Sequence, residues 1–115
     1  MTGQIVVFST CASAEEAARL ARGLVEARLA ACVSVSREIR SYYHWQGAVE
    51  ESGEFLLVIK TSRDAFDALR RWIEKEHPYE IPELIALPIL DGAPNYLNWL
   101  RESVAPPAPG PAPGA

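Results

Sequence analysis

The sequence predicts an α+β fold whose elements follow the order β-α-β-β-α-β, with a short helix at the end. Two continuous apolar runs, residues 5–8 and 55–59, have the composition of strands that are buried on both faces. Apolar residues at helical spacing follow each of these runs. A long alternating segment, residues 32–45, and a two-residue turn predict a hairpin that joins the two halves.

The first helix is predicted to follow the strand at residues 5–8. Ser13 is a typical N-cap residue, and Glu16 lies three positions later, as in a capping box. The apolar residues that recur at helical spacing form the expected buried face: Ala17, Leu20, Ala21, Leu24 and Val25. The charged residues between them are expected to face solvent.

Residues 32–45 predict one long strand, because apolar and polar residues alternate along them. This alternation places the apolar residues on one face: Val33, Val35, Ile39, Tyr43 and Trp45. Gln46 and Gly47 form the predicted tight turn. The chain returns through the run at 55–59, and Gly53 is expected to mark a bulge or bend in this returning strand.

A second helix is predicted to begin at Thr61 or Ser62 and to bury one apolar stripe: Phe66, Leu69 and Ile73. Residues 84–90 predict a fourth strand. Pro88 favours an edge position for this strand, because proline has no N–H to donate to a neighbour. Pro94 suits the first turn of a short final helix.

Two right-handed βαβ crossovers that are joined through a hairpin give the ferredoxin-like split sheet. In this topology the first and third strands are central and the second and fourth form the edges, in agreement with the two apolar runs and with Pro88. We expect residues 1–104 to form a single domain. Residues 105–115 contain only Pro, Ala and Gly, and we expect them to form a disordered tail.

The predicted second strand is a long edge strand with an apolar face. Monomeric proteins rarely expose such an edge, because its unpaired N–H and C=O groups can pair with another chain. We therefore expect a homo-oligomer whose interface includes the apolar residues near the hairpin tip: Tyr42, Tyr43, Trp45 and Val49. The alternative is that these side chains fold back onto their own subunit.

The composition narrows the possible partners and location. A formal net charge of −4 argues against nucleic acid as a main partner, since phosphate binding needs a basic face. The chain has no apolar run of membrane-spanning length and no basic amphipathic helix, so no membrane partner is expected. No signal peptide is recognised, and Cys11 and Cys32 lie outside any C-x-x-C motif, so a cytoplasmic location is expected.

Residues 76–83 combine one histidine, one tyrosine, three carboxylates and two prolines. Pro78 and Pro82 restrict the backbone, so neighbouring side chains are held in place at low entropic cost. This rigidity suits a binding site, and it equally suits a helix-to-strand turn with no further role. For His77 alone, a hydrogen-bonded turn residue is the simpler interpretation.

Several segments of the chain resemble the CutA divalent-cation tolerance proteins in order and spacing. These segments are ACV (31–33), SYYHWQG (41–47), EFLLVIKT (54–61), HPYEIPE (77–83) and YLNW (96–99). The resemblance covers roughly residues 4–103. It implies a ferredoxin-like subunit, a tight homotrimer similar in architecture to the PII-type signalling proteins, and a link to tolerance of divalent cations, chiefly copper, in bacteria.

The resemblance also implies a candidate metal site. In some members of the family the ligands are a cysteine that ends the first strand and a histidine pair before the Pro-Tyr sequence. Here Ser9 stands at the position of that cysteine, Glu76 replaces the first histidine and His77 is the second. Cys11 could share the face of Ser9 if the strand continued. The candidate ligands for copper or another divalent cation are therefore His77, Glu76, Cys11, Glu80 and Glu83.

Two other classes of function stay open. In a PII-like sensor or trimeric adaptor, clefts between subunits would hold a small ligand or partner, and Lys60, Tyr79 and Trp45 could supply a charge and aromatic surfaces. No Gly-rich phosphate loop supports nucleotide binding. For an enzyme, no local motif pairs a nucleophile with a base, so no catalytic activity is expected.

Overall fold

The computed structural model describes residues 2–106. The predicted order of elements is confirmed. In sequence the elements are β1 (Gln4–Cys11), α1 (Ala14–Glu26), β2 (Cys32–Trp45), β3 (Ala48–Ser62), the 3-10 turn η1 (Arg63–Ala65), α2 (Phe66–Glu76), β4 (Ile85–Pro88) and α3 (Pro94–Ser103).

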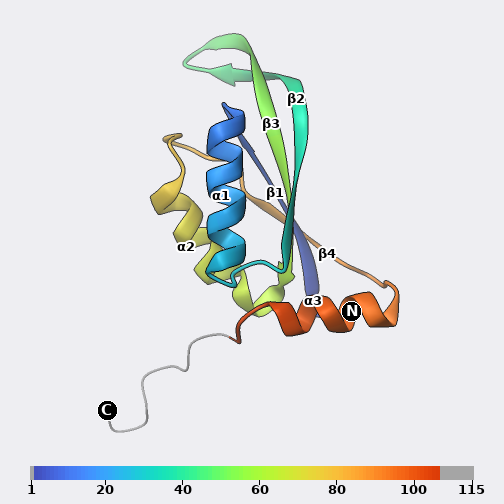
Figure 1. The fold of residues 1–115 in the computed structure, drawn as a ribbon. Helices are drawn as coiled ribbons and strands as arrows, with labels where there is room; N and C mark the ends of the chain where they lie inside the picture. The colour runs from blue at the N-terminus through green and yellow to red at the C-terminus, as the bar shows by residue number, and fades with distance from the viewer. Residues whose placement is uncertain (1, 107–115) are drawn as a thin grey trace, which may run out of the picture.

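The four strands form one antiparallel sheet in the order β2-β3-β1-β4. The two strands from the apolar runs, β1 and β3, are central, and β2 and the Pro88-bearing β4 are the edges, as predicted. Helices α1 and α2 lie side by side on one face of the sheet, and α3 lies across its lower end (Figure 1). The ferredoxin-like split arrangement is therefore confirmed.

The core lies between the sheet and the two helices. Alternate residues of the central strands face the helices, and Val7, Leu57 and Ile59 are fully buried there. The helices contribute the predicted stripes, of which these residues are fully buried: Ala17, Leu20, Leu24, Leu69 and Ile73. Helix α2 packs closely on α1 at Gly23, where a Cβ atom would lie 2.6 Å from the Trp72 ring. Only glycine leaves room for that ring.

The predicted helix starts are also confirmed. Ser13 Oγ accepts a hydrogen bond from Glu16 N at the start of α1, and Ser62 Oγ accepts one from Ala65 N before α2. The side chain of Glu16 is bound by Arg19, whose Nη2 lies 2.8 Å from Glu16 Oε2. Pro94 occupies the first turn of α3, as expected.

The prediction that the apolar residues of β2 share one face is wrong. A β-bulge interrupts the register, so that Val35 pairs with Leu57 but Glu38 pairs with Phe55. One extra residue of β2 therefore shifts the later side chains to the other face. Val33 and Val35 face the helices, and the residues beyond the bulge face the opposite side: Ile39, Tyr43 and Trp45.

The bulge lies on the strand opposite the one predicted. Gly53 of β3 pairs with Arg40 of β2 in the regular register, so no bulge forms at the glycine. A Cβ atom on Gly53 would lie 2.7 Å from Glu38 Cδ. The glycine therefore leaves room for the Glu38 side chain, which projects across it from the edge of the bulge.

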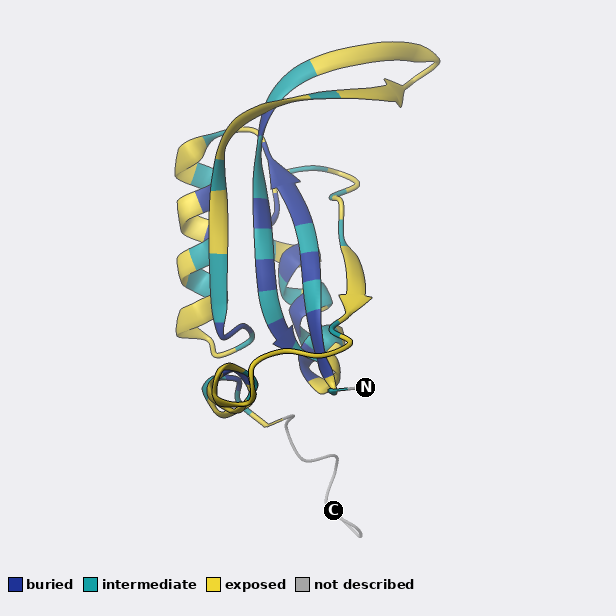
Figure 2. Ribbon diagram, turned by 90° about the vertical axis from the view of Figure 1, so that its right-hand side faces the viewer, coloured by how far each residue is buried: buried dark blue, intermediate teal, exposed yellow. Residues whose placement is uncertain are grey.

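The β2-β3 hairpin extends well beyond the helices and curls over at its tip (Figure 1). Gln46 and Gly47 form the predicted two-residue turn, with φ values of 51° and 83°. Most of the projecting segment is exposed (Figure 2). The four predicted interface residues all belong to it and are 67%, 42%, 38% and 69% exposed: Tyr42, Tyr43, Trp45 and Val49.

Helices α1 and α2 cover only one face of the sheet (Figure 2), and the second face also carries apolar side chains. Val6, Phe8, Leu56 and Val58 on the central strands are half-buried. On β4, Ile85 and Leu87 extend the same surface and are 53% and 49% exposed. We call this surface, with these six residues, the open sheet face.

The described chain ends shortly after α3. Ala105 N donates a hydrogen bond to Arg28 O. The rest of the predicted disordered tail, residues 107–115, lies outside the described residues, so the domain boundary at residue 104 stays a prediction. None of the helices in residues 2–106 combines the length and apolar character that a membrane crossing requires.

Candidate functional site at the end of the central strands

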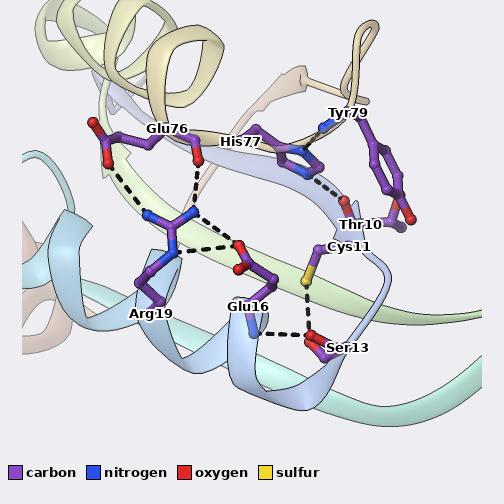
Figure 3. A network of polar contacts seen from close by, with 8 residues as sticks. All are labelled: Thr10, Cys11, Ser13, Glu16, Arg19, Glu76, His77 and Tyr79. Atoms are coloured by element: carbon purple, nitrogen blue, oxygen red, sulfur yellow. Dashed lines mark hydrogen bonds and ion pairs between the residues drawn. The ribbon is translucent and has the colours of Figure 1, made fainter.

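The segment between α2 and β4 lies against the end of β1, and His77 is the link between them (Figure 3). The imidazole is buried, with Nε2 2.7 Å from Thr10 O. Its other nitrogen, Nδ1, accepts a hydrogen bond of 3.0 Å from Tyr79 N. A carbonyl oxygen can only accept and a backbone N–H can only donate, so the ring carries its proton on Nε2.

Both ring nitrogens of His77 are therefore engaged by the backbone. A metal ion binds the lone pair of a neutral imidazole nitrogen, and here Nδ1 uses that lone pair to accept from Tyr79 N. The imidazole fastens the turn at Pro78 to the last residues of β1. This arrangement is the one expected from a hydrogen-bonded turn histidine.

Tyr79 is fixed at both ends of its side chain. Its hydroxyl donates to Glu54 Oε2 over 2.8 Å, and its ring centroid lies 4.7 Å from that of His77. Burial, with a smaller effect of the hydrogen bond to Glu54, raises the pKa of Tyr79 above its usual value. The tyrosine therefore stays protonated and keeps donating to the carboxylate.

Glu54 is the functional residue that sequence reasoning missed. It is only 7% exposed, yet its side chain lies on the open sheet face, in register with Ile39. A single carboxylate directly before the apolar run at 55–59 was the available signal. The nearby protein removes part of the water around the exposed Glu83 carboxyl, and this desolvation, together with the charge of Glu54, raises the pKa of Glu83.

Glu76 belongs to a separate ion-pair network between the two helices (Figure 3). Arg19 Nη1 lies 3.2 Å from Glu76 Oε1, and Arg19 Nη2 donates to both Glu76 O and Glu16 Oε2. The bound carboxylates raise the pKa of Arg19, with the hydrogen bond to Glu16 as the largest cause. The guanidinium thus satisfies a carbonyl at the C-terminal end of α2 and ties it to α1.

Cys11 shares the helix-facing side of β1 with Ser9, as expected, and both are fully buried. Its Sγ lies 3.7 Å from Ser13 O and 4.0 Å from Phe55 O. Burial raises the pKa of the Cys11 thiol, and a protonated thiol is a poor metal ligand. Neither its surroundings nor its protonation state prepares Cys11 to bind a cation.

The predicted metal ligands do not fit a preformed metal site. His77 and Glu76 are engaged by other protein groups, Cys11 is fully buried, which raises the pKa of its thiol, and Glu80 and Glu83 are exposed. Within residues 2–106, no three side chains of His, Cys, Asp or Glu form a group that could hold a metal ion. The side chains of residues 76–83, which are grouped together in the sequence, thus serve several different contacts.

The two aromatic residues that were predicted to contact a small ligand lie close together in the structure. Trp45 and Tyr79 line a hollow of about 220 Å³, which is completed by Tyr43, Glu80 and Ile81. Its lining residues come from the hairpin tip and from the segment after α2, and the tip curls towards that segment (Figures 1 and 2). Lys60 is not part of it: this residue lies six positions along β3 from Glu54, about 20 Å at the rise of an extended strand.

Comparison with known proteins identifies close relatives. The sequence model described as CutA1 divalent ion tolerance protein matches residues 5–103. The Divalent-cation tolerance protein CutA of Thermus thermophilus is 48% identical over 98 residues, which cover 85% of this chain and 95% of that protein. A solved structure of the divalent cation tolerance protein Cut A1 from Thermus thermophilus superimposes with a TM-score of 0.87 at 46% identity, covering 89% of this chain and 99% of that chain.

Some relatives are longer than this chain. Protein CutA of Mus musculus is 44% identical over 95 residues, covering 83% of this chain but 54% of the mouse protein. Protein CutA, chloroplastic, of Arabidopsis thaliana is 41% identical over 99 residues, covering 86% of this chain and 54% of the plant protein. Its name assigns the plant protein to the chloroplast, so relatives differ in location and the cytoplasmic location of this chain stays a prediction.

Proposed function

The chain belongs to the CutA1 divalent ion tolerance protein family, and we propose that it acts as a homotrimer in the response to divalent cations. The observation that carries the oligomer is the open sheet face. Six apolar residues of β1, β3 and β4 lie there without a covering helix among residues 2–106. An apolar surface of this kind marks an interaction site.

The hairpin supports the same proposal. β2 is a 14-residue edge strand, and its outer half projects past the helices with four large apolar side chains exposed. An exposed edge of this length invites pairing with another chain. Three subunits, rather than two, follow from the resemblance to the PII-like architecture.

The oligomer is tested by light scattering on two charge substitutions. Ile85→Glu places a carboxylate on the open sheet face, at a residue that is 53% exposed. Val25→Glu is the control on α1: the sequence predicts Val25 to be buried, but it is 40% exposed and lies near Val33, away from the open sheet face. We expect the mass of a trimer for the unmodified chain and for Val25→Glu, and a smaller mass for Ile85→Glu. A monomeric mass for the unmodified chain would refute the proposal.

Copper binding through His77 stays a prediction. In the described conformation, binding would require the imidazole to give up its hydrogen bond from Tyr79 N. Calorimetric titration with copper and zinc, beside His77→Ala and the control His44→Ala on the hairpin, measures it directly. Saturable binding that is lost only in His77→Ala would support a metal site, whereas absence of saturable binding would assign the cation response to an indirect role.

A small-molecule sensor is the second candidate function, and the hollow between the hairpin tip and Tyr79 is the observation in its favour. A cavity with aromatic walls and few polar groups is typical of a ligand site. No catalytic activity is proposed, since the names of the relatives describe tolerance of cations and not a reaction.

A further inference from the structure

We propose that the hollow bounded by Tyr43, Trp45 and Tyr79 binds a small organic cation of the alkylated ammonium class. The proposal goes beyond the response to metal ions and does not require His77 as a ligand. Because Tyr43 and Trp45 are also predicted interface residues, it requires an assembly that leaves the hollow open to the ligand. The walls of the hollow, its charge and its size all favour such a ligand.

Three of the five residues that line the hollow are aromatic, and two of these rings are held in place. The hydroxyl of Tyr79 is bound to Glu54 Oε2 at 2.8 Å, and the hydroxyl of Tyr43 lies 3.2 Å from Ser52 Oγ. Hydrogen bonds at the far end of each ring fix its orientation. Preorganised walls of this kind lower the entropic cost of binding.

The faces of aromatic rings carry negative potential and attract cations. Trp45 is the strongest of the three for this purpose, and 38% of its surface is exposed. Quaternary ammonium groups are the ligands that aromatic cages recognise, because their spread charge is easily separated from water. A bare metal ion gains less here, since the rings offer it no lone pair.

The charges around the hollow have the sign that a cation requires. Glu80 lines the hollow, Glu54 holds one of its rings, and Glu50 lies opposite Tyr43 in the hairpin register. No lysine or arginine is among the lining residues within the described chain. The same carboxylates repel phosphates and other anions, so a nucleotide does not suit this site.

The size of the hollow sets the size of the ligand. Its volume of about 220 Å³ lies below the range of roughly 300–1,000 Å³ that is usual for sites of drug-sized ligands. A trimethylammonium group with a short chain matches such a space. Ile81, which is 72% exposed, adds an apolar side against which methyl groups can pack.

Titration with choline chloride tests the proposal, with 3,3-dimethylbutan-1-ol as the control ligand in which carbon replaces the charged nitrogen. Calorimetry on the full chain is expected to give saturable binding of choline, one per subunit, and binding of the neutral alcohol weaker by roughly tenfold or more. Equal binding of both compounds would mean that the hollow is merely apolar, and absence of saturable choline binding would overturn the proposal outright.

Two tryptophan variants locate the site. Trp45→Leu is expected to weaken choline binding by roughly tenfold, while Trp99→Leu, at a residue of similar exposure on α3, leaves it unchanged. Glu80→Gln, which keeps the shape of the side chain, is expected to weaken choline binding. The binding that remains is expected to depend less on salt concentration. Choline binding that Trp45→Leu leaves intact would place the ligand elsewhere.

The mass of each sample, measured in the same buffer, separates this proposal from the trimer. A trimer that fails to bind choline contradicts only the organic-cation site. A monomer that binds it contradicts only the assembly.

Discussion

At the scale of single residues, the site is organised by a buried carboxylate. Glu54 is 7% exposed. Its carboxylate accepts a hydrogen bond from the hydroxyl of Tyr79, which lies in a distant segment of the chain. A buried charge is tolerated only when hydrogen bonds replace its lost water. Tyr79, itself fastened through its N–H to His77, therefore connects the segment after α2 to the middle of β3.

This connection predicts a dependence of stability on alkaline pH. The pKa of Tyr79 is raised in the folded chain above its usual value of 10.0, which we take for the unfolded chain. Above that pH the unfolded chain releases the phenol proton while the folded chain retains it, so the unfolded state is favoured. The stabilisation from Tyr79 is thus fully present below pH 10 and is lost as the pH rises towards the folded pKa.

Urea unfolding at pH values from about 8 to 11 tests this expectation. Tyr79→Phe is expected to lower the free energy of unfolding near neutrality by about 1.5–3 kcal/mol, the usual worth of a hydrogen bond to a charged group. It is also expected to flatten the loss of stability at alkaline pH. Tyr42→Phe, at a tyrosine that is 67% exposed, is the control that keeps the slope of the unmodified chain. Equal slopes in all three chains would contradict the assigned role of Tyr79.

The residues of the site illustrate what a sequence can predict. Residues 76–83 are recognisable from the sequence as a stiff, polar turn, and the structure places them against the end of β1 as a turn held by hydrogen bonds. The sequence did not predict that Glu76, His77 and Tyr79 would each bind a different partner. Arg19 reaches Glu76 from 57 positions away, and Glu54 reaches Tyr79 from 25 positions away, and no local pattern encodes such partners.

At the scale of elements, the bulge in β2 shows where pattern reasoning fails. Val33, Val35 and Ile39 keep a spacing of two or four in sequence, so they fit a single strand face despite the polar Arg37 between them. A period of two therefore does not reveal the extra residue between Val35 and Glu38. The chain permits the shift because the outer half of the hairpin lies beyond the helices. There, the helix-facing side covers no core, and the apolar residues turn to the opposite face.

The contact between α1 and α2 gives a prediction at the same scale. Alanine in place of glycine within a helix normally stabilises it by about 1 kcal/mol. At Gly23 the new methyl group would lie 2.6 Å from the Trp72 ring, which packs against the core. We expect Gly23→Ala to destabilise the fold by about 1–3 kcal/mol instead, as overpacking does.

Denaturant unfolding of four chains measures this effect: the unmodified chain, Gly23→Ala, Trp72→Leu and the double variant. The cost of the added methyl group is expected to shrink when Trp72 is already replaced, because the two changes share one contact. Arg22→Ala, at the neighbouring exposed position of α1, is expected to change stability by no more than about 0.5 kcal/mol. A stabilising Gly23→Ala would mean that the helices separate freely.

At the scale of the whole molecule, the subunit has one well-packed core, and it also has apolar surfaces that stay exposed to solvent. The helix-facing side of the sheet is filled by fully buried side chains, while the open sheet face keeps apolar groups at half exposure. The hairpin adds a second exposed apolar surface, since its outer half projects beyond the helices (Figure 1). The residues of the core therefore differ from those of the proposed assembly, and we expect that the assembly can be removed without loss of the fold.

Shortening the hairpin tests this separation. Ser41 pairs with Ser52 four residues below the Trp45–Ala48 pair that flanks the present turn, so it has the same place in the alternating hydrogen-bond pattern. Replacing residues 42–51 by Asn-Gly would therefore close a new two-residue turn without changing the register. The replacement removes all four predicted interface residues of the hairpin: Tyr42, Tyr43, Trp45 and Val49.

We expect the shortened chain to fold, because every residue that it loses is exposed and none belongs to the core. Its circular dichroism should remain that of an α+β protein, while its mass falls below that of the trimer and its unfolding ceases to depend on protein concentration. The unmodified chain, by contrast, should become more stable as its concentration rises. A shortened chain that still forms a trimer would mean that the open sheet face suffices for assembly and that the exposed hairpin residues serve another purpose, such as the aromatic hollow.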